Sequence, residues 1–419
     1  MKETPETVRR AYYVLTAGNT LAASLIWGIN TIFLLDAGLS NFEAFAANAF
    51  YTAGMVLFEI PTGIVADSWG RRASFLCGTV TLAVTTVLYV LLWQQHAAFV
   101  WWAIVSALLG LGFTFFSGAT EAWLVDALTA TGFTGQLETV FSRGQVVAGT
   151  MMLIGSVAGG YLAQLTNLGV PYLVRAGVLM VMFAVAMVIM HDLGFTPDRS
   201  QRPLAEMRVI MRSSVDNGLK VPAIRATMLA GVFTGGVGIY VFYALQPYLL
   251  NLWGDPTAYG IAGLVAAIVA GAQIAGGLLT PKIRSLFRRR TSALLLLQAV
   301  GVGLLALIGL VDSFWMVVVL VVVWALSGSA IRPIRQAYLN AMIPSPQRAT
   351  ILSFDSLMTS AGGIVAQPLL GKSADVWSYQ ASYLLSAAGS ALALPFVLRA
   401  RQLAVPADTE VAPTDVPSV

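Results

Sequence analysis

Twelve stretches of about twenty or more largely apolar residues restrict this chain to the folds that cross a membrane. A bilayer core about 30 Å thick needs about 20 apolar residues for each spanning helix. Only 11% of the 419 residues are charged, against roughly 25% in a soluble globular domain. The sequence predicts an all-α integral membrane protein with twelve transmembrane helices, at residues 11–36, 42–66, 73–93, 98–127, 139–165, 170–191, 223–250, 258–281, 291–311, 314–341, 350–371 and 379–398.

Lys and Arg residues are concentrated in alternate loops between these segments, whereas the opposite loops hold little beyond Lys372. Positive residues are enriched in cytoplasmic loops, so we expect a multi-pass protein with both termini in the cytoplasm. The net charge of +4 follows from this asymmetry and gives no reason to expect nucleic-acid binding. Residues 1–10 are polar, and no cleavable signal peptide is expected before the first segment.

The chain divides into two halves of six segments. Residues 1–191 and 223–401 are the predicted six-helix bundles, and the polar residues 192–222 form a cytoplasmic linker with an expected amphipathic helix. The two halves share weak internal repeats, such as Ser117-Gly118 and Ser327-Gly328. Related bundles of this kind are used for alternating access, with the binding site near the membrane midplane. Residues 402–419 are predicted to be a disordered tail.

The loop between the second and third segments reads Gly-Ile-Val-Ala-Asp-Ser-Trp-Gly-Arg-Arg, residues 63 to 72. This pattern resembles the signature of the major facilitator superfamily. The resemblance covers about residues 8 to 400, and the Ser117 to Asp126 run is similar to that of a bacterial branch of drug exporters. It implies two six-helix bundles related by a pseudo-two-fold axis, a bacterial inner (plasma) membrane location and a function as a monomer.

The signature also implies a conformational latch. Gly63 is expected to let a helix end pack tightly, and Gly70 is expected to give the turn its backbone freedom. Asp67 and Arg71 carry opposite charges. The resemblance adds Asp126 at the end of segment 4 to this network, which would form only in one conformational state. The alternative is a static ion pair that holds the fold. The latch residues are Gly63, Asp67, Gly70, Arg71, Arg72 and Asp126.

Glu121 lies deeper than Asp126 on segment 4, about 7.5 Å along the helix axis. In this fold segments 1, 4, 7 and 10 line the central cavity. A partly desolvated carboxylate there is expected to have a raised pKa and to exchange protons near neutral pH. Glu121, together with Asp126, is therefore the candidate for proton coupling. The alternative is an ion pair between Glu121 and an arginine of the other half.

Arg332 and Arg335 occupy one face of segment 10. Three interpretations remain open for them: a salt-bridge gate to the acids of segment 4, an anchor for an anionic substrate, and a structural pair with Asp355 on segment 11. The predicted substrate cavity combines aromatic, amide and charged side chains, namely Trp27, Asn30, Glu121, Trp123, Tyr240, Tyr243, Gln246, Arg332 and Arg335.

Such a lining suits lipophilic or amphipathic small molecules, so the sequence predicts a proton-coupled exporter of drug-like compounds. Two alternatives remain: a carrier of organic anions or lipid-like molecules bound through Arg332 and Arg335, and a receptor or scaffold that transports nothing. Segment 5 carries Gly155-Ser156-Val157-Ala158-Gly159-Gly160, in which serine replaces the proline of the family's antiport motif. We expect no enzymatic activity, cofactor or metal site; the expected partners are a small-molecule substrate, protons and the lipid bilayer.

Overall fold

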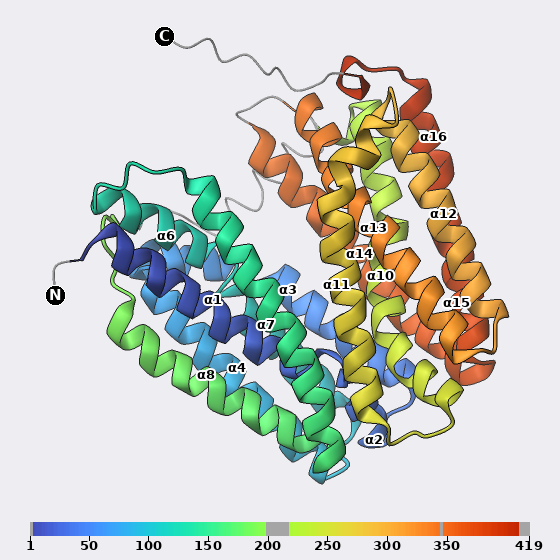
Figure 1. The fold of residues 1–419 in the computed structure, drawn as a ribbon, viewed down its shortest axis with the longest axis horizontal. Coiled ribbons are helices and arrows are strands. Elements are labelled where there is room, and N and C mark those ends of the chain that lie inside the picture. The colour runs from blue at the N-terminus through green and yellow to red at the C-terminus, as the bar shows by residue number, and fades with distance from the viewer. Residues whose placement is uncertain (1–2, 198–217, 344–346, 410–419) are drawn as a thin grey trace. The chain divides into compact units, whose positions relative to one another are not determined.

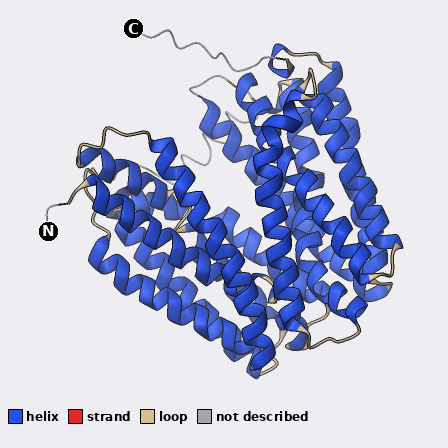
Figure 2. Ribbon diagram, in the orientation of Figure 1, coloured by secondary structure: helices blue, strands red, loops and turns tan. Residues whose placement is uncertain are grey.

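The computed structural model describes residues 3–197, 218–343 and 347–409. Described regular structure is helical throughout (Figure 2). The helices of the first half of the chain are α1 (Pro5–Trp27), α2 (Asn30–Asp36), α3 (Asn41–Trp69), α4 (Arg71–Gln94), α5 (Phe99–Thr114), α6 (Ala119–Ala130), α7 (Leu137–Leu165) and α8 (Gly169–Ile189). Those of the second half are α10 (Pro222–Trp253), α11 (Tyr259–Ser285), α12 (Arg290–Leu310), α13 (Phe314–Met342), α14 (Arg348–Val376), α15 (Tyr379–Ala391) and α16 (Leu394–Gln402).

Each of the twelve predicted segments corresponds to one helix or to one broken pair of helices. The breaks separate α1 from α2, α5 from α6 and α15 from α16. Among the described residues, ten helical spans are long and apolar enough to cross a membrane, and the α1–α2 pair, bent by 47°, makes an eleventh. Helix α14 also has the length of a span, but its sequence is more polar and it is not among these.

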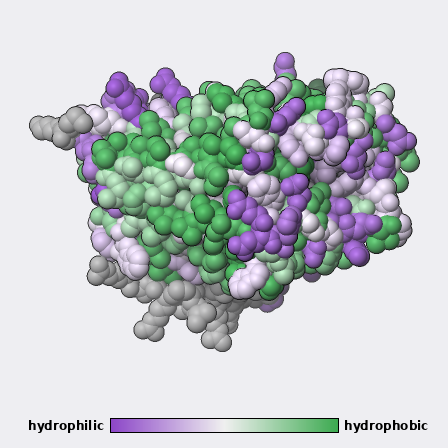
Figure 3. Space-filling model, turned by 90° about the horizontal axis from the view of Figure 1, so that it is seen from below, coloured by the Kyte–Doolittle hydropathy of each residue, from purple (hydrophilic) through white to green (hydrophobic). Residues whose placement is uncertain are grey.

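Large apolar side chains are exposed on the surface of the molecule. Leu165, Val188 and Leu278 are each more than 70% exposed, and Figure 3 shows hydrophobic side chains gathered over a wide area. A soluble monomer rarely exposes apolar patches larger than a few hundred Å². The exposed apolar surface therefore fits a protein surrounded by lipid.

The structure contains two compact units. Unit 1 comprises residues 1–206, 242–271 and 367–375, and unit 2 comprises residues 207–241, 272–366 and 376–419. One end of α10, of α11 and of α14 thus belongs to the same unit as the first half of the chain. The predicted amphipathic helix of the linker falls mostly on residues 198–217, which lie outside the described residues.

In unit 1, α1 lies beside α7 and α8 (Figure 1). Helix α3 packs against α5 in the same unit. The core of this unit includes the buried rings of Phe33, Tyr89, Trp102 and Tyr172. Phe33 stacks on Tyr172 with 4.0 Å between ring centroids. In unit 2, α12 packs against α13 and α15.

The predicted disordered tail is corrected by the structure at its start. Residues Pro406–Asp408 form a 3-10 helix, and Asp408 is 1% exposed. Its carboxylate accepts hydrogen bonds from the backbone N of Thr291, at 2.8 Å, and from the Thr291 hydroxyl, at 2.7 Å. This aspartate therefore satisfies one free backbone N–H and one hydroxyl at the start of α12.

Replacing Asp408 by alanine should therefore destabilise the protein. Hydrogen bonds to a charged group contribute about 1.5–3 kcal/mol, so we expect the melting temperature in detergent to fall by several degrees. Asp408→Asn keeps an acceptor for the Thr291 backbone and should lose less. An unchanged melting temperature for Asp408→Ala would show that the tail contact contributes nothing to stability.

Candidate functional site

The first predicted transmembrane segment is broken at Gly28 and Ile29, between α1 and α2. A break leaves backbone groups without their helical partners. The buried side chain of Gln246, on α10, satisfies two of them: its Nε2 donates to the Trp27 carbonyl at 2.6 Å, and its Oε1 accepts from the Thr31 backbone N at 3.0 Å. All these residues belong to unit 1. Gln246 thus bridges the broken helix across a distance of more than 200 residues in sequence.

A polar network continues from the break into the first half of the chain. Tyr172 donates its hydroxyl to Asn30 Oδ1 at 3.0 Å, and Asn30 Nδ2 donates to Asn48 Oδ1 at 3.1 Å. Asn48 is 9% exposed, and its Nδ2 has no hydrogen-bond partner among the described residues. Buried polar groups are nearly always hydrogen-bonded. This amide donor is therefore available to an acceptor that is not part of the described chain, such as a buried water molecule.

The structure brings four of the predicted cavity residues together in unit 1. Trp27, Asn30, Tyr243 and Gln246 all belong to this unit, and the ring of Trp27 meets Phe242 edge to face at 5.9 Å. Two other predicted residues are placed in the core instead. Tyr240 is fully buried in unit 2, where it donates to Ser382 at 2.7 Å.

Trp123 is buried too, at 2% exposure, and its indole Nε1 donates to the His191 carbonyl at 2.7 Å. This contact anchors α6 to the chain that follows α8. Packing against the neighbouring helices therefore accounts for Trp123 without a ligand.

The signature loop contains an ion pair between two of the predicted latch residues. Arg71 Nη1 lies 2.6 Å from Asp67 Oδ1. Gly70 has a φ of 104°, a conformation that favours glycine. At Gly63 a Cβ would meet nothing within 4 Å, so no close helix contact involves this glycine in this conformation. Asp126 forms no ion pair with Arg71 among the described residues, and its backbone carbonyl lies against Gly194.

Asp192, which follows α8, contacts the signature loop in a way that sequence reasoning missed. Its Oδ1 accepts from the backbone N of Arg72 at 2.9 Å and so caps the start of α4. The guanidinium of Arg72 donates to the Met187 carbonyl at 2.5 Å. Burial raises the pKa of the Asp192 carboxyl above its usual value, and the nearby Arg72 opposes that shift.

A pH dependence of stability follows from this raised pKa. The folded protein binds a proton more readily than the unfolded chain does, so the contribution of Asp192 is most favourable below the unfolded pKa and declines as pH rises through the folded pKa. Asp192→Asn keeps the cap without the buried charge and should reduce this decline. Asp192→Ala loses the cap and should cost about 1 kcal/mol. Melting temperatures between about pH 4 and pH 8 would test both, and identical pH profiles for native protein and Asp192→Asn would contradict the assignment.

Glu121, the predicted proton carrier, is exposed rather than partly desolvated. It forms no ion pair with another described residue. Its helix α6 begins at Ala119 after the left-handed residue Gly118, whose φ is 70°. This break in segment 4 places Glu121 in the first turn of α6, where a carboxylate is favoured by the helix dipole.

Of the three interpretations of the arginines on segment 10, the structure contains the pair with Asp355. Arg335 donates from Nη1 to Asp355 Oδ2 at 2.6 Å and from Nη2 to Asp355 Oδ1 at 2.5 Å. It also donates to the Thr227 carbonyl at 3.1 Å. Arg332 is exposed. In this conformation, therefore, Arg335 is engaged by the protein, and of the two arginines only Arg332 remains available to an anion.

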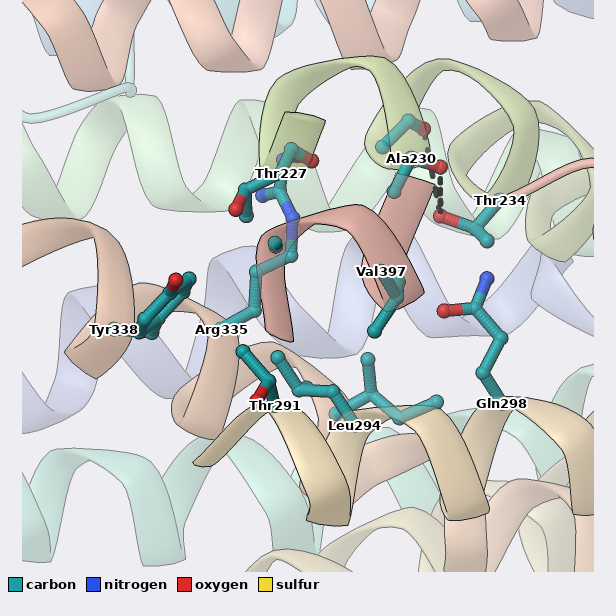
Figure 4. Close-up of a pocket in the computed structure, with 12 residues that line it drawn as sticks. Thr227, Ala230, Thr234, Thr291, Leu294, Gln298, Arg335, Tyr338 and Val397 are labelled. Atoms are coloured by element: carbon teal, nitrogen blue, oxygen red, sulfur yellow. Dashed lines mark hydrogen bonds between the residues drawn. The ribbon is translucent and has the colours of Figure 1, made fainter. Parts of the chain in front are cut away.

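Arg335 also lines a pocket inside unit 2 (Figure 4). Three polar atoms of lining residues are buried without a partner among the described residues: Gln298 Nε2, Tyr338 Oη and Arg335 Nε. Thr234 donates to the Ala230 carbonyl at the rim. Buried water typically occupies polar pockets of this kind. No group of three or more metal-ligating side chains occurs in the part of the chain that the structure describes.

Sequence reasoning missed a buried cation in unit 1 and an acid that links two distant helices. Arg175, about two turns from the start of α8, is 9% exposed. Asp375 of α14 accepts from the backbone N of Asn41 at 2.9 Å and of Phe42 at 2.8 Å, and so caps α3. An arginine within an apolar segment is a reason to consider Arg175 a candidate functional residue from the sequence alone. Nothing in the sequence pairs Asp375 with Asn41.

Comparisons with known proteins agree with this architecture. The family model of the Major Facilitator Superfamily matches residues 12–297 and 227–417. The multidrug resistance protein MdtG of Salmonella dublin is 25% identical over 315 residues, which cover 74% of this chain and 72% of that protein. The uncharacterized MFS-type transporter YxaM of Bacillus subtilis is 22% identical over 400 residues, which cover 92% and 94%.

Solved transporter structures share the fold at low sequence identity. A mutant of the nucleoside transporter NupG superposes with a TM-score of 0.77 at 13% identity and covers 94% of this chain and 99% of its own. An inward-facing bacterial homologue of the human lysosomal transporter Spinster gives 0.72 at 14% identity, with coverage of 96% and 98%. The two-bundle helical fold, the signature loop and the match along both halves agree, and the chain belongs to the major facilitator superfamily.

Proposed function

We propose that this transporter exports small lipophilic or amphipathic compounds in exchange for protons by alternating access. The observation that carries the proposal is the bridge from Gln246 to the broken first helix. It joins the first and second halves of the sequence by two hydrogen bonds at a buried break. Such a contact holds one conformation and can be exchanged for water when the helices separate.

A second contact of the same kind supports the proposal. The Asp375 carboxylate caps α3 through the backbone N of Asn41 and of Phe42. Both contacts are hydrogen bonds from one side chain to backbone groups at a helix end. The relatives named MdtG are described as multidrug resistance proteins, which favours export of drug-like compounds. A bacterial inner-membrane location, cytoplasmic termini and a monomeric state belong to the same proposal.

Proton coupling is proposed at Glu121, in the first turn of α6, with Asp126 further along the same helix. Proton uptake by Glu121 removes its negative charge and the favourable interaction with the helix dipole. Loss of that charge also weakens any ion pair that Glu121 forms during the transport cycle. The Asp67–Arg71 latch would then respond to the resulting movement of α6 and the signature loop.

The experiment is proton flux in proteoliposomes under an imposed pH gradient, with lipophilic cations, neutral drugs and organic anions as test compounds. Native protein should show substrate-triggered proton movement, and Glu121→Gln should reduce it by at least about 100-fold, as for loss of a proton-transfer group. Glu138→Gln is the matched control, because Glu138 is an exposed acid at the start of α7. If Glu121→Gln kept the proton flux and the pH dependence of the native protein, Glu121 would be excluded as the proton carrier.

Transport of an organic anion is the second candidate function. The exposed guanidinium of Arg332 supports it, whereas Arg335 would first have to leave Asp355. Competition by simple carboxylates, without competition by lipophilic cations, would favour this candidate. A receptor or scaffold would bind a compound and move neither that compound nor protons in the same proteoliposomes.

A further inference from the structure

Arg175 is a buried guanidinium without a counter-ion among the described residues of unit 1. It lies on α8 within a predicted membrane span, and its side chain forms no hydrogen bond or ion pair with any described residue. Charged side chains inside a membrane cost several kcal/mol and are nearly always paired. Arg335 shows the usual solution, because Asp355 neutralises it with two hydrogen bonds. For Arg175 the described part of the chain supplies no such acid.

The groups around Arg175 are phenol rings rather than carboxylates. The tyrosines close enough to interact electrostatically with its guanidinium are Tyr51, Tyr89, Tyr172 and Tyr243. Two of their hydroxyls are already engaged: Tyr89 pairs with Ser106 at 2.5 Å, and Tyr172 donates to Asn30. Tyr51 and Tyr243 form no such bond among the described residues. These two hydroxyls therefore remain free to donate.

The same region contains a second unpaired donor. Asn48 and Tyr51 are one turn apart on α3, and Tyr172 and Arg175 are one turn apart on α8, so each pair shares a helix face. The network from Tyr172 through Asn30 to Asn48 joins the two faces. It leaves Asn48 Nδ2 buried without an acceptor from any described residue. Unpaired donors and one positive charge are thus concentrated in one region of unit 1.

We propose that Arg175 and Asn48, with the hydroxyls of Tyr51 and Tyr243, bind the anionic group of an amphipathic organic acid. A carboxylate accepts several hydrogen bonds and matches the planar fork of a guanidinium. The ring of Tyr243 meets Phe242 at 5.3 Å, and Phe242 meets Trp27. These rings offer an apolar surface for the rest of the molecule. The proposal rests on the transport function and names the class of molecule that is carried.

The test is binding of 2-naphthoate to the purified full-length protein, measured by titration calorimetry, beside its cationic analogue 2-naphthylmethylammonium. We expect the native protein to bind the acid and not the amine. Arg175→Gln should weaken binding of the acid at least tenfold, and Arg175→Lys should recover part of the loss because it restores the charge. Tyr243→Phe should weaken binding several-fold. Arg399→Gln, at an exposed arginine at the end of α16, should bind as the native protein does.

Two controls separate this proposal from a structural role and from the proposed function. Size-exclusion profiles and melting temperatures show whether each Arg175 variant is folded, and Tyr243→Phe tests the site if they are not. Equal affinity of native protein and folded Arg175→Gln for 2-naphthoate would overturn the proposal, as would loss of binding in Arg332→Gln alone. Proton-coupled movement of lipophilic cations without any binding of the acid would leave the transport function standing and overturn only the anion site.

Discussion

Replacing Gln246 by leucine is expected to reduce transport at least tenfold while the protein still folds. The substitution removes both hydrogen bonds to the break between α1 and α2, and it leaves the Trp27 carbonyl and the Thr31 N–H without partners. Each unsatisfied buried group costs about 1–3 kcal/mol. These unsatisfied groups raise the free energy only of the conformation in which α10 contacts the break. Because about 1.4 kcal/mol changes an equilibrium tenfold, that conformation should become rare.

A second substitution separates the two hydrogen bonds of Gln246. Gln246→Glu keeps an acceptor for the Thr31 N–H, but its carboxyl donates to the Trp27 carbonyl only when it is protonated, so the loss of transport should grow as pH rises. Gln95→Leu, in the exposed turn after α4, is the control. Initial transport rates should be combined with labelling of a cysteine placed at Thr31 in a Cys77→Ser background.

The labelling result decides between a gate and a structural bridge. Faster labelling of this cysteine in Gln246→Leu would show that the break becomes exposed to water more often. If Gln246→Leu showed the same transport rate and the same labelling rate as the native protein, the Gln246 bridge would not act as a gate. Loss of transport with unchanged labelling would place the effect elsewhere in the cycle.

The hydropathy of the sequence is enough to predict the helices of this fold, because each spanning helix must satisfy its own backbone in lipid. It does not predict where a helix breaks. Segments 1 and 4 are continuous apolar stretches, yet α1 ends at Trp27 and α5 ends at Thr114. The first break is stabilised by Gln246, which is distant in sequence. Such a dependence on tertiary contacts is invisible to a local pattern.

The candidate site was predictable to the extent that its residues differ from an apolar background. Polar or aromatic residues stand out on segments that line the cavity of the family, as Trp27, Asn30, Tyr243 and Gln246 do. By contrast, three acids each cap a helix that begins far away in the chain, namely Asp192, Asp375 and Asp408. Polar residues in loops have many such potential partners, and only the folded arrangement selects one.

Gly159→Val should have the largest effect on folding, because Gly159 lies where α7 approaches α1 most closely. A Cβ at this position would collide with the backbone carbonyl of Leu25. Rotation of a side chain cannot relieve a collision with backbone, so α1 and α7 would have to separate along one of the most extensive helix contacts of unit 1. A cost of about 3 kcal/mol or more is expected, a large part of a typical stability of about 5–15 kcal/mol.

The expected result is therefore that most of the folded Gly159→Val protein is lost in membranes, with a fall of many degrees in the melting temperature of the remainder. Gly177→Val is a closely matched control, because Gly177 also lies within a spanning helix of the first half and a Cβ there would meet nothing within 4 Å. Fluorescence-detected size exclusion of both variants would measure the difference. If Gly159→Val folds and melts as Gly177→Val does, the glycines of segment 5 are not required for close packing, and a role in the transport cycle becomes the better explanation for them.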